Sequence, residues 1–159
     1  MNRAVFLDRD GVINRERGEY TFKIADFVLL PDVAQTIAQI NERGVKVIVI
    51  SNQGGVAKGL YRIEDVDRLH NHLRELLARQ NAQIDAVFFS PNHEIAGKSL
   101  DRKPGTLLFE KAGYLYDIDF SQSFMIGDSR RDVEAAEKMG IHSFLIEPNT
   151  SIKFIVKHL

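Results

Sequence analysis

Two aspartates separated by a single residue follow an apolar stretch near the start of the chain, in the run AVFLDRDG. The stretch 4–7 has the composition of a buried strand, and Asp8 and Asp10 come directly after it. Because strand side chains alternate between faces, the two carboxylates would point the same way if the strand continued. Like charges so close together are costly unless a positive group lies between them. The spacing therefore indicates either a solvated strand end or a place for a cation.

Polar and charged residues also follow the next three apolar stretches of the chain. Taken singly these groups are ordinary, since Asp-Gly usually forms a turn and Gly-Asp-Ser before a helix is usually a cap. In a doubly wound sheet, however, ligands bind outside the carboxyl ends of the strands. Their joint occurrence there predicts one functional site. The residues are Ser51, Asn52 and Gln53, then Arg102 and Lys103, then Asp128 and Asp132.

Five apolar runs rich in Val, Ile and Phe alternate with helical patterns. Near-continuous apolar runs of this kind are typical of strands buried on both faces in parallel sheets. The alternation predicts right-handed crossovers and an α/β three-layer sandwich with a central, mostly parallel, Rossmann-like sheet, as one domain over 1–159. The expected strands are 3–8, 45–51, 84–90, 123–128 and 141–146. The expected helices are 31–44, with Pro31 in its first turn, 63–80, 106–115 and 130–140, and a final helix over 151–159.

The composition narrows the classes of function. Lys and Arg number 21 against 22 Asp and Glu, a net charge of −1, which argues against a general nucleic-acid or membrane-surface binder. There is no cysteine, which excludes disulfides and thiolate metal sites. No long apolar run suggests a signal peptide or a membrane span. We therefore expect a cytoplasmic protein.

Four motifs, in order and over nearly the whole chain, resemble the signatures of the haloacid dehalogenase superfamily: FLDRDG, ISNQ, RKPG and GDSRRD. The combination is far more specific than any single motif. The resemblance implies a phosphatase in which Asp8 attacks phosphorus to form an aspartyl-phosphate and Asp10 is the general acid–base. It also implies that the Asp8 carboxylate, the Asp10 backbone carbonyl and Asp128 hold Mg²⁺, with Ser51 and Lys103 in the catalytic set.

Physical chemistry agrees with those implied roles. A carboxylate that attacks a phosphomonoester meets an anion, so Mg²⁺ and a lysine must offset the repulsion. The Ser51 hydroxyl can bind phosphoryl oxygens, and Lys103 supplies a point charge. To act as an acid, Asp10 must hold a proton near pH 7, which an anionic neighbourhood would favour. Asp132 either ligates the metal through water or holds Lys103.

The chain leaves room for no large cap domain, because 11–31 can form only a small flap. The site should therefore be open, in a monomer or in an oligomer that covers it. Within the capless group, FLDRDGVIN, SNQGGVAKG and RKPG resemble the heptose bisphosphate and histidinol-phosphate phosphatases. This implies a small phosphorylated metabolite, such as heptose 1,7-bisphosphate, as substrate. The implied substrate contacts are Glu16, Arg17, Asn52, Gln53 and Arg102.

The chain departs from that branch in a loop that usually carries zinc. Relatives have Cys-x-His and later Cys-x-Cys before Arg-Lys-Pro, whereas this chain has other residues at all four positions. Zinc requires thiolate or imidazole ligands in such a site, and His93 alone cannot supply them. We therefore expect no zinc and a loop at 91–102 held by hydrogen bonds. The replaced positions are Ser90, Asn92, Ser99 and Asp101. A second departure is Ser129, where heptose enzymes tend to have lysine and where Arg130 is a candidate substitute.

The sequence leaves other functions open. A receiver domain has similar groups, but in a different order, since Lys103 here precedes Asp128. Intact motifs argue against a catalytically silent binding protein. A phosphatase of nucleic-acid 3′ ends is another alternative, although no basic stripe is evident. His70, His72 and His93 are interpreted as surface or loop residues.

Overall fold

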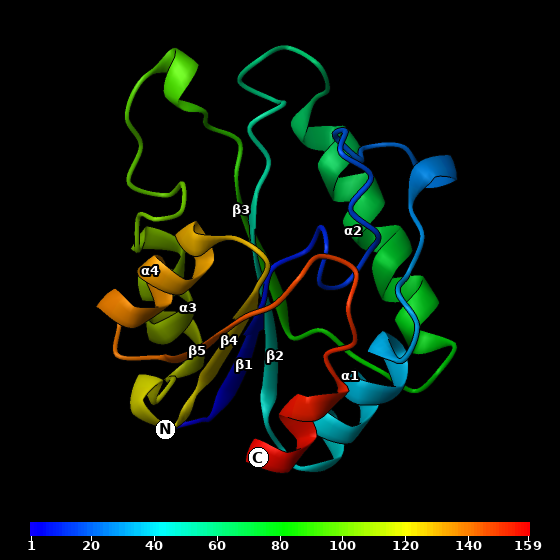
Figure 1. The fold of residues 1–159 in the computed structure, drawn as a ribbon, viewed down its shortest axis with the longest axis vertical. Helices are drawn as coiled ribbons and strands as arrows, with labels where there is room; N and C mark the ends of the chain where they lie inside the picture. The colour runs from blue at the N-terminus through cyan, green and yellow to red at the C-terminus, as the bar shows by residue number, and fades with distance from the viewer.

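The computed structural model describes residues 1–159 and contains one five-stranded sheet in the order β3-β2-β1-β4-β5. All four strand pairs are parallel, as expected for apolar strands joined by helices. The strands are β1 (Ala4–Leu7), β2 (Lys46–Asn52), β3 (Ala86–Ser90), β4 (Phe124–Gly127) and β5 (His142–Leu145). The α/β sandwich predicted from the sequence is confirmed (Figure 1).

Helices cover both faces of the sheet and bury two separate apolar clusters (Figure 1). On one face, α1 (Val33–Glu42), α2 (Ile63–Ala78) and the C-terminal 3₁₀ helix Lys153–His158 pack over residues such as Val49. On the other face, α3 (Leu107–Tyr116) and α4 (Arg130–Lys138) pack over residues such as Phe6. Each helix thus places an apolar stripe on the sheet and leaves its polar face to solvent.

Two expected elements differ from those observed. The first helix begins at Val33 rather than at Pro31, because Asp32 adopts a left-handed conformation with φ of 65° that a right-handed helix cannot contain. The tail forms the short 3₁₀ helix rather than an α-helix. It is held in place by tertiary packing, since Ile152 and Ile155 are fully buried in the cluster under α1.

The strand order explains why distant motifs meet. β1 is the central strand, with β2 on one side and β4 on the other, so the chain changes direction across the sheet at β1. Leu7 pairs with Val49 in β2 and with Ile126 in β4, which brings the three carboxyl ends to one edge. Such a switch point is where open α/β sheets bind ligands.

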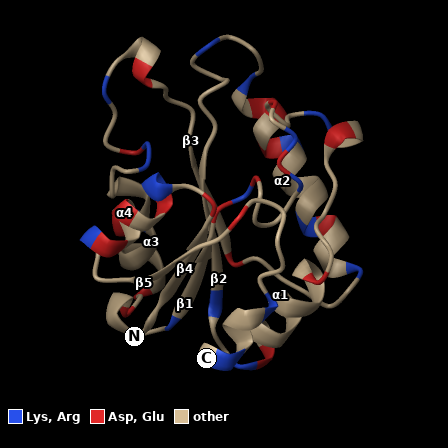
Figure 2. Cartoon of the chain, viewed as in Figure 1, with Lys and Arg blue, Asp and Glu red and all other residues tan.

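No large cap domain lies over this edge, only loops that rise beyond the strands in the upper part of Figure 1. Acidic and basic residues are interspersed over helices and loops, and the strands carry few of them (Figure 2). None of the helices has the length and apolar character needed to cross a membrane.

Candidate active site

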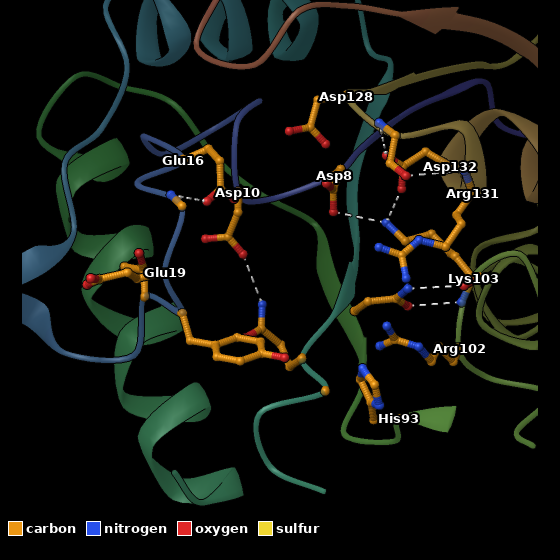
Figure 3. A pocket seen from close by; sticks show the side chains of 17 residues that line it. Asp8, Asp10, Glu16, Glu19, His93, Arg102, Lys103, Asp128, Arg131 and Asp132 are labelled. Atoms are coloured by element: carbon orange, nitrogen blue, oxygen red, sulfur yellow. Dashed lines mark hydrogen bonds and ion pairs between the residues drawn. The ribbon is translucent and has the colours of Figure 1, made fainter. Parts of the chain in front are cut away.

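A polar pocket of about 510 Å³ opens at the carboxyl ends of the strands (Figure 3). It is lined by Asp8 and Asp10 after β1, by Asn52 and Gln53 at the end of β2, by Arg102 and Lys103 before α3, and by Asp128 and Asp132 around the start of α4. The residues predicted at this edge thus meet in one pocket, except Ser51, which is fully buried and does not line it.

Lys103 lies at the centre of a buried ion-pair group. Its Nζ is 2.9 Å from Oδ1 of Asp8 and 2.5 Å from Oδ1 of Asp132, and it donates a third hydrogen bond to the Ile50 carbonyl. The lysine side chain is only 2% exposed. Burial would lower the pKa of Lys103, but the Asp132 and Asp8 carboxylates raise it, so the ammonium stays charged. The structure shows one of the two roles considered for Asp132, since it holds Lys103; ligation of the metal through water stays a prediction.

Asp132 is itself fixed by the start of α4. Its Oδ2 accepts a hydrogen bond from the backbone N–H of Ser129, and the Ser129 hydroxyl accepts one from Arg131 N–H. This reciprocal cap sets the position of the carboxylate relative to the strand end. Gly127 makes the close approach possible, since a Cβ there would lie 2.2 Å from the Cβ of Asp132.

Three carboxylates crowd together next to the lysine. One oxygen from each of Asp8, Asp128 and Asp132 lies within 4.8 Å of the others. Burial and the charge of Asp132 raise the pKa of Asp8 to about 8 and that of Asp128 to about 6. Mg²⁺ prefers oxygen ligands, and a cation here would relieve the repulsion between the carboxylates. The donor set thus fits a magnesium ion.

Asp10 lies in a cationic neighbourhood rather than the anionic one expected from the sequence. Its Oδ1 accepts hydrogen bonds from Arg9 and Asn14, both at 2.9 Å, and its Oδ2 accepts one from Gln53 at 3.2 Å. Burial would raise the pKa of Asp10, but the Arg9 charge and these donors outweigh it and hold the pKa below its ordinary value. The carboxylate is therefore ionised in the free protein.

Sequence reasoning missed Arg9 and His70. Arg9 is fully buried and also donates to the Thr21 carbonyl, while its Nη1 lies 3.4 Å from Nε2 of His70. His70 is 3% exposed, so its interpretation as a surface residue was wrong. Its spacing from Val66 and Leu73 places it on the apolar stripe of α2, and that periodicity could have identified it as buried.

The residues at the end of β2 form hydrogen bonds with one another and with the backbone of Lys103. The Asn52 amide donates to the Lys103 carbonyl and accepts from the Lys103 N–H. Ser51 is fully buried, and its hydroxyl accepts a 2.8 Å hydrogen bond from Gln53. The Gln53 carbonyl accepts from the Tyr61 hydroxyl, whose pKa burial raises to about 12, so that it remains a donor. Gln53 thus orients its amide toward both Asp10 and Ser51.

The pocket has walls of opposite charge (Figure 3). The flap loop after β1 contributes Glu16 and Glu19, and the opposite wall contributes His93, Arg102 and Arg131. His93 was interpreted as a surface or loop residue; it is a loop residue that lines the pocket. A wall with three nitrogen-bearing side chains is suited to a second anionic group on a ligand.

Two arginines considered from the sequence lie elsewhere. Arg17 forms ion pairs with Glu19 and Asp26 and does not line the pocket. Arg130 does not line it either, whereas its neighbour Arg131 does. The helical turn at the start of α4 directs successive side chains about 100° apart, so only one of these two neighbours faces the site.

A contact from the C-terminal part of the chain fixes the flap. The Asn149 side chain accepts from the Glu16 N–H at 2.7 Å and donates to the Glu16 carbonyl at 3.1 Å, while its own N–H bonds the Gly11 carbonyl. Gly11 has φ of 84°, and a Cβ there would lie 2.1 Å from Oδ2 of Asp128. No side chain can replace this glycine without disturbing the acidic group.

Comparison with known proteins identifies relatives of this chain. Residues 100–151 match the family model for HAD-hydrolase-like proteins. The chain is 39% identical over 154 residues to the D-glycero-D-manno-heptose-1,7-bisphosphate 7-phosphatase of Thermosynechococcus vestitus, covering 91% of this chain and 78% of the relative. It is 40% identical over 152 residues to the D-glycero-beta-D-manno-heptose-1,7-bisphosphate 7-phosphatase of Rhodopseudomonas palustris, covering 91% and 83%.

A solved structure shows the same arrangement of elements. The D,D-heptose 1,7-bisphosphate phosphatase of B. bronchiseptica, crystallised with magnesium and phosphate, superposes with a TM-score of 0.85 at 29% identity, over 90% of this chain and 79% of that chain. The motifs, the fold and these relatives agree. The chain belongs to the haloacid dehalogenase-like hydrolases, in the family of the D-glycero-D-manno-heptose 1,7-bisphosphate 7-phosphatases.

Proposed function

We propose that this protein is a Mg²⁺-dependent phosphatase of the cytoplasm that removes the 7-phosphate from a D-glycero-D-manno-heptose 1,7-bisphosphate. The observation that carries the proposal is the buried group in which Lys103 lies 2.9 Å from Oδ1 of Asp8 and beside Asp132. It presents the Asp8 carboxyl, which a bound Mg²⁺ would keep ionised, next to a fixed positive charge, the arrangement that attack on an anionic phosphate needs. Family membership supplies the substrate class.

The first half-reaction transfers the phosphoryl group to the protein. An oxygen of Asp8 forms a bond to phosphorus, and the bond between phosphorus and the sugar oxygen breaks. The leaving oxygen takes a proton from Asp10, so the sugar departs as an alcohol. Lys103 contributes positive charge beside Asp8. The Ser51 hydroxyl oxygen accepts from Gln53, so its O–H can donate a hydrogen bond to a phosphoryl oxygen.

The second half-reaction restores both aspartates. A water molecule attacks phosphorus and gives a proton to Asp10, while the bond between phosphorus and Asp8 breaks. Inorganic phosphate leaves, Asp8 is again a carboxylate, and Asp10 is again an acid. Atoms and charges balance over the cycle as one phosphomonoester and one water giving one alcohol and one phosphate.

Asp10 therefore needs a proton that the free protein does not hold. Arg9, Asn14 and Gln53 keep its carboxylate ionised. A phosphate dianion entering the pocket adds negative charge close to Asp10 and raises its affinity for a proton. Binding of substrate thus promotes protonation of Asp10 in the pocket, where its proton is needed.

The proposed reaction uses a Mg²⁺ ion bound beside Asp8. Asp8, Asp128 and the backbone carbonyl of Asp10 would hold Mg²⁺, with Asp132 close enough to orient its waters. When bound, the ion withdraws charge from phosphoryl oxygens and lowers the repulsion between phosphate and carboxylate. The side chains of the protein itself make all the other contributions to the reaction.

The wall that carries Arg102 and Arg131 favours a substrate with two phosphates. The reacting phosphate occupies the end of the pocket beside Asp8 and Lys103. His93 and Arg102 lie farther from Asp8 in Figure 3, and Arg131 lines the same pocket. A second phosphate would meet these side chains, and Asn52 and Gln53 line the same pocket. Glu16 and Glu19 on the opposite wall offer acceptors for sugar hydroxyls.

The direct test is phosphate release from the two anomers of heptose 1,7-bisphosphate in the presence of Mg²⁺. We expect one equivalent of phosphate and a heptose 1-phosphate product, identified by ³¹P NMR. Asp8→Asn should reduce kcat by at least about 1000-fold, since it removes the nucleophile.

Histidinol phosphate and an oligonucleotide with a 3′-phosphate should be assayed alongside. Faster turnover of either compound would replace the proposed substrate, and no turnover of any compound would overturn the phosphatase proposal. Activity in Asp8→Asn equal to wild type would overturn the aspartyl-phosphate route. Sedimentation of the active protein would show whether the open pocket belongs to a monomer or is covered in an oligomer.

A further inference from the structure

Hydrogen bonds to one carboxylate, that of Asp101, hold together the loop between β3 and α3. Oδ1 of Asp101 accepts hydrogen bonds from the Ser90 hydroxyl at 2.6 Å, from the Asn92 amide at 3.0 Å and from the Ser99 hydroxyl. The same Asn92 amide lies 3.2 Å from the second oxygen of Asp101. We refer to Ser90, Asn92, Ser99 and Asp101 as the Asp101 knot. The expectation that hydrogen bonds hold this loop is confirmed.

The knot is anchored to the sheet and to the rest of the site. Ser90 is the last residue of β3 and is fully buried, and its carbonyl accepts from the Gln53 N–H at 2.7 Å. Its hydroxyl also accepts from the Asn92 N–H at 3.2 Å. The end of β3 therefore fixes one side of the knot, and the rest of the loop is held to Ser90 by hydrogen bonds.

The knot lies directly beside Arg102. Asp101 precedes Arg102 in the chain, and the Asn52 amide holds the backbone of Lys103 on the other side. The Asn92 side chain bonds Asp101, and the Asn92 backbone carbonyl accepts from Nη1 of Arg102 at 3.1 Å. The backbone of Arg102 is thus fixed at both neighbours, and its side chain is fixed by a member of the knot.

Packing completes the placement of the guanidinium. Nε of Arg102 donates to Glu94 at 3.2 Å, and a Cβ on Gly54 would lie 2.9 Å from its Nη1. Arg102 is 9% exposed although it lines the pocket. A long, flexible side chain loses about 2 kcal/mol of rotamer entropy when it is fixed, so a structure that fixes it beforehand favours ligand binding.

The donor set of the knot does not fit zinc. Structural zinc sites use thiolates and imidazoles, whereas these four residues offer two hydroxyls, one amide and one carboxylate. Their polar atoms already bond one another. These hydrogen bonds also hold the pKa of Asp101 below its ordinary value, against burial, so the carboxylate remains an acceptor at neutral pH.

We propose that Asp101 is a positioning residue that gathers Ser90, Asn92 and Ser99 into a metal-free knot, which holds Arg102 against the pocket for contact with substrate. The substrate contact of Arg102 rests on the proposed function. The metal-free folding of the loop does not, and it is tested separately.

The first experiment measures hydrogen exchange of peptides covering 91–102 by mass spectrometry, with and without a zinc chelator. Protection should be unchanged by the chelator in the wild type. It should fall at least about tenfold in Asp101→Ala, because the acceptor of the knot is lost. Lys98→Ala is the matched control, since Lys98 lies exposed in the same loop and forms no hydrogen bond or ion pair there.

Two results would overturn the metal-free knot. One is stoichiometric zinc in the purified protein with protection lost on chelation. The other is unchanged protection of the loop in Asp101→Ala. If this variant fails to fold, Asn92→Ala and Ser99→Ala each remove only part of the hydrogen bonds of the knot and leave its acceptor in place. They should show the same loss of protection to a smaller degree.

The second experiment measures steady-state kinetics on heptose 1,7-bisphosphate and on p-nitrophenyl phosphate. Asp101→Asn should raise KM for the bisphosphate about tenfold, with kcat within about threefold, because a charge-assisted contact is displaced rather than the reacting groups. The kinetics on p-nitrophenyl phosphate, which lacks a second phosphate, should be unchanged.

A double-mutant cycle tests the link to Arg102. The effect of Asp101→Asn should disappear in an Arg102→Ala background, because Asp101 acts through that arginine. Full additivity of the two substitutions would overturn the positioning role. A protein with no turnover on any substrate would remove the proposed function and leave the exchange result to decide the knot.

Discussion

The guanidinium of Arg9 lies 2.9 Å from Oδ1 of Asp10, its neighbour in the sequence, and is completely shielded from solvent. The pair connects three parts of the molecule, because Arg9 also bonds the Thr21 carbonyl of the flap and approaches His70 of α2. A buried residue of the bend after β1 thus serves to orient the proposed acid–base. Its Nε has no partner in the structure, so Asp10 and Thr21 supply the main polar contacts of this buried charge.

We predict that Arg9→Met lowers kcat by about 10- to 100-fold with little change in KM, because Asp10 loses the donor that fixes its orientation. The free energy of unfolding should fall by about 3–5 kcal/mol, as expected when a buried pair loses one partner. Urea unfolding and steady-state kinetics measure the two effects. Arg15→Met is the control, since Arg15 is exposed and forms no ion pair; equal kcat in the two variants would contradict the role of Arg9.

His70 should remain neutral throughout the physiological pH range. Burial, together with the charges of Arg9 and Arg74 and against the weaker pull of Asp10, lowers the pKa of His70 from 6.5 to about 3. The unfolded chain takes up this proton as pH falls below about 6.5, whereas the folded protein does not. The contribution of His70 to stability is therefore complete above pH 6.5 and declines toward pH 3, by at most about 1.4 kcal/mol per pH unit.

Thermal unfolding between pH 4 and 8 checks this dependence. His70→Gln should remove part of the decline, and the His70 ring signals in NMR spectra should not titrate between pH 5 and 8. A His70 resonance that titrates near 6.5 would show that the ring is not enclosed beside Arg9.

Mg²⁺ should stabilise the folded protein. The carboxylates of Asp8, Asp128 and Asp132 lie close together and repel one another, so a bound cation favours the folded state. At 100 times its dissociation constant the ion should add about 2.7 kcal/mol, equal to about 5–10 °C in Tm. Scanning calorimetry with and without Mg²⁺ measures the shift. Asp128→Asn should lose most of it and Asp67→Asn, on the exposed face of α2, should keep it.

Arg131 and Arg130 form a matched pair of neighbours. Only Arg131 lines the pocket, so Arg131→Ala should raise KM for heptose 1,7-bisphosphate about tenfold by removing one contact to a phosphate. Arg130→Ala should leave KM within about twofold, because surface substitutions away from the site have small effects. Initial-rate kinetics on both variants decide between the two positions. A larger effect of Arg130→Ala would place the second phosphate elsewhere.

Asn149 should control the flap without taking part in chemistry. Its side chain bonds both the N–H and the carbonyl of Glu16. Asn149→Gly keeps the left-handed backbone that the φ of 66° requires and removes both hydrogen bonds. We expect KM to rise about three- to tenfold, corresponding to about 0.7–1.4 kcal/mol for the two hydrogen bonds together, with kcat unchanged. Thr150→Ala, next in the chain, is the control; a fall in kcat alone would contradict this role.

The composition of the strands and the spacing of the motifs determined much of this protein in advance. Apolar runs joined by amphipathic helices predict a parallel sheet, and residues that end parallel strands must meet at one edge. Asp8 and Asp128 could therefore be assigned to one site from strand order alone, whereas Lys103 lies in the long loop after β3 and was assigned through its motif.

Only the tertiary structure decided which neighbours those residues have. Arg17 and Arg130 have suitable side chains, but loop conformation and helix phase direct them away from the pocket. Burial of Arg9 and His70 depends on the packing of α2 against the loop after β1, which no local pattern describes in full. Electrostatic energies follow such distances and burial, so the ionised state of Asp10 could be known only once the surrounding charges were in place.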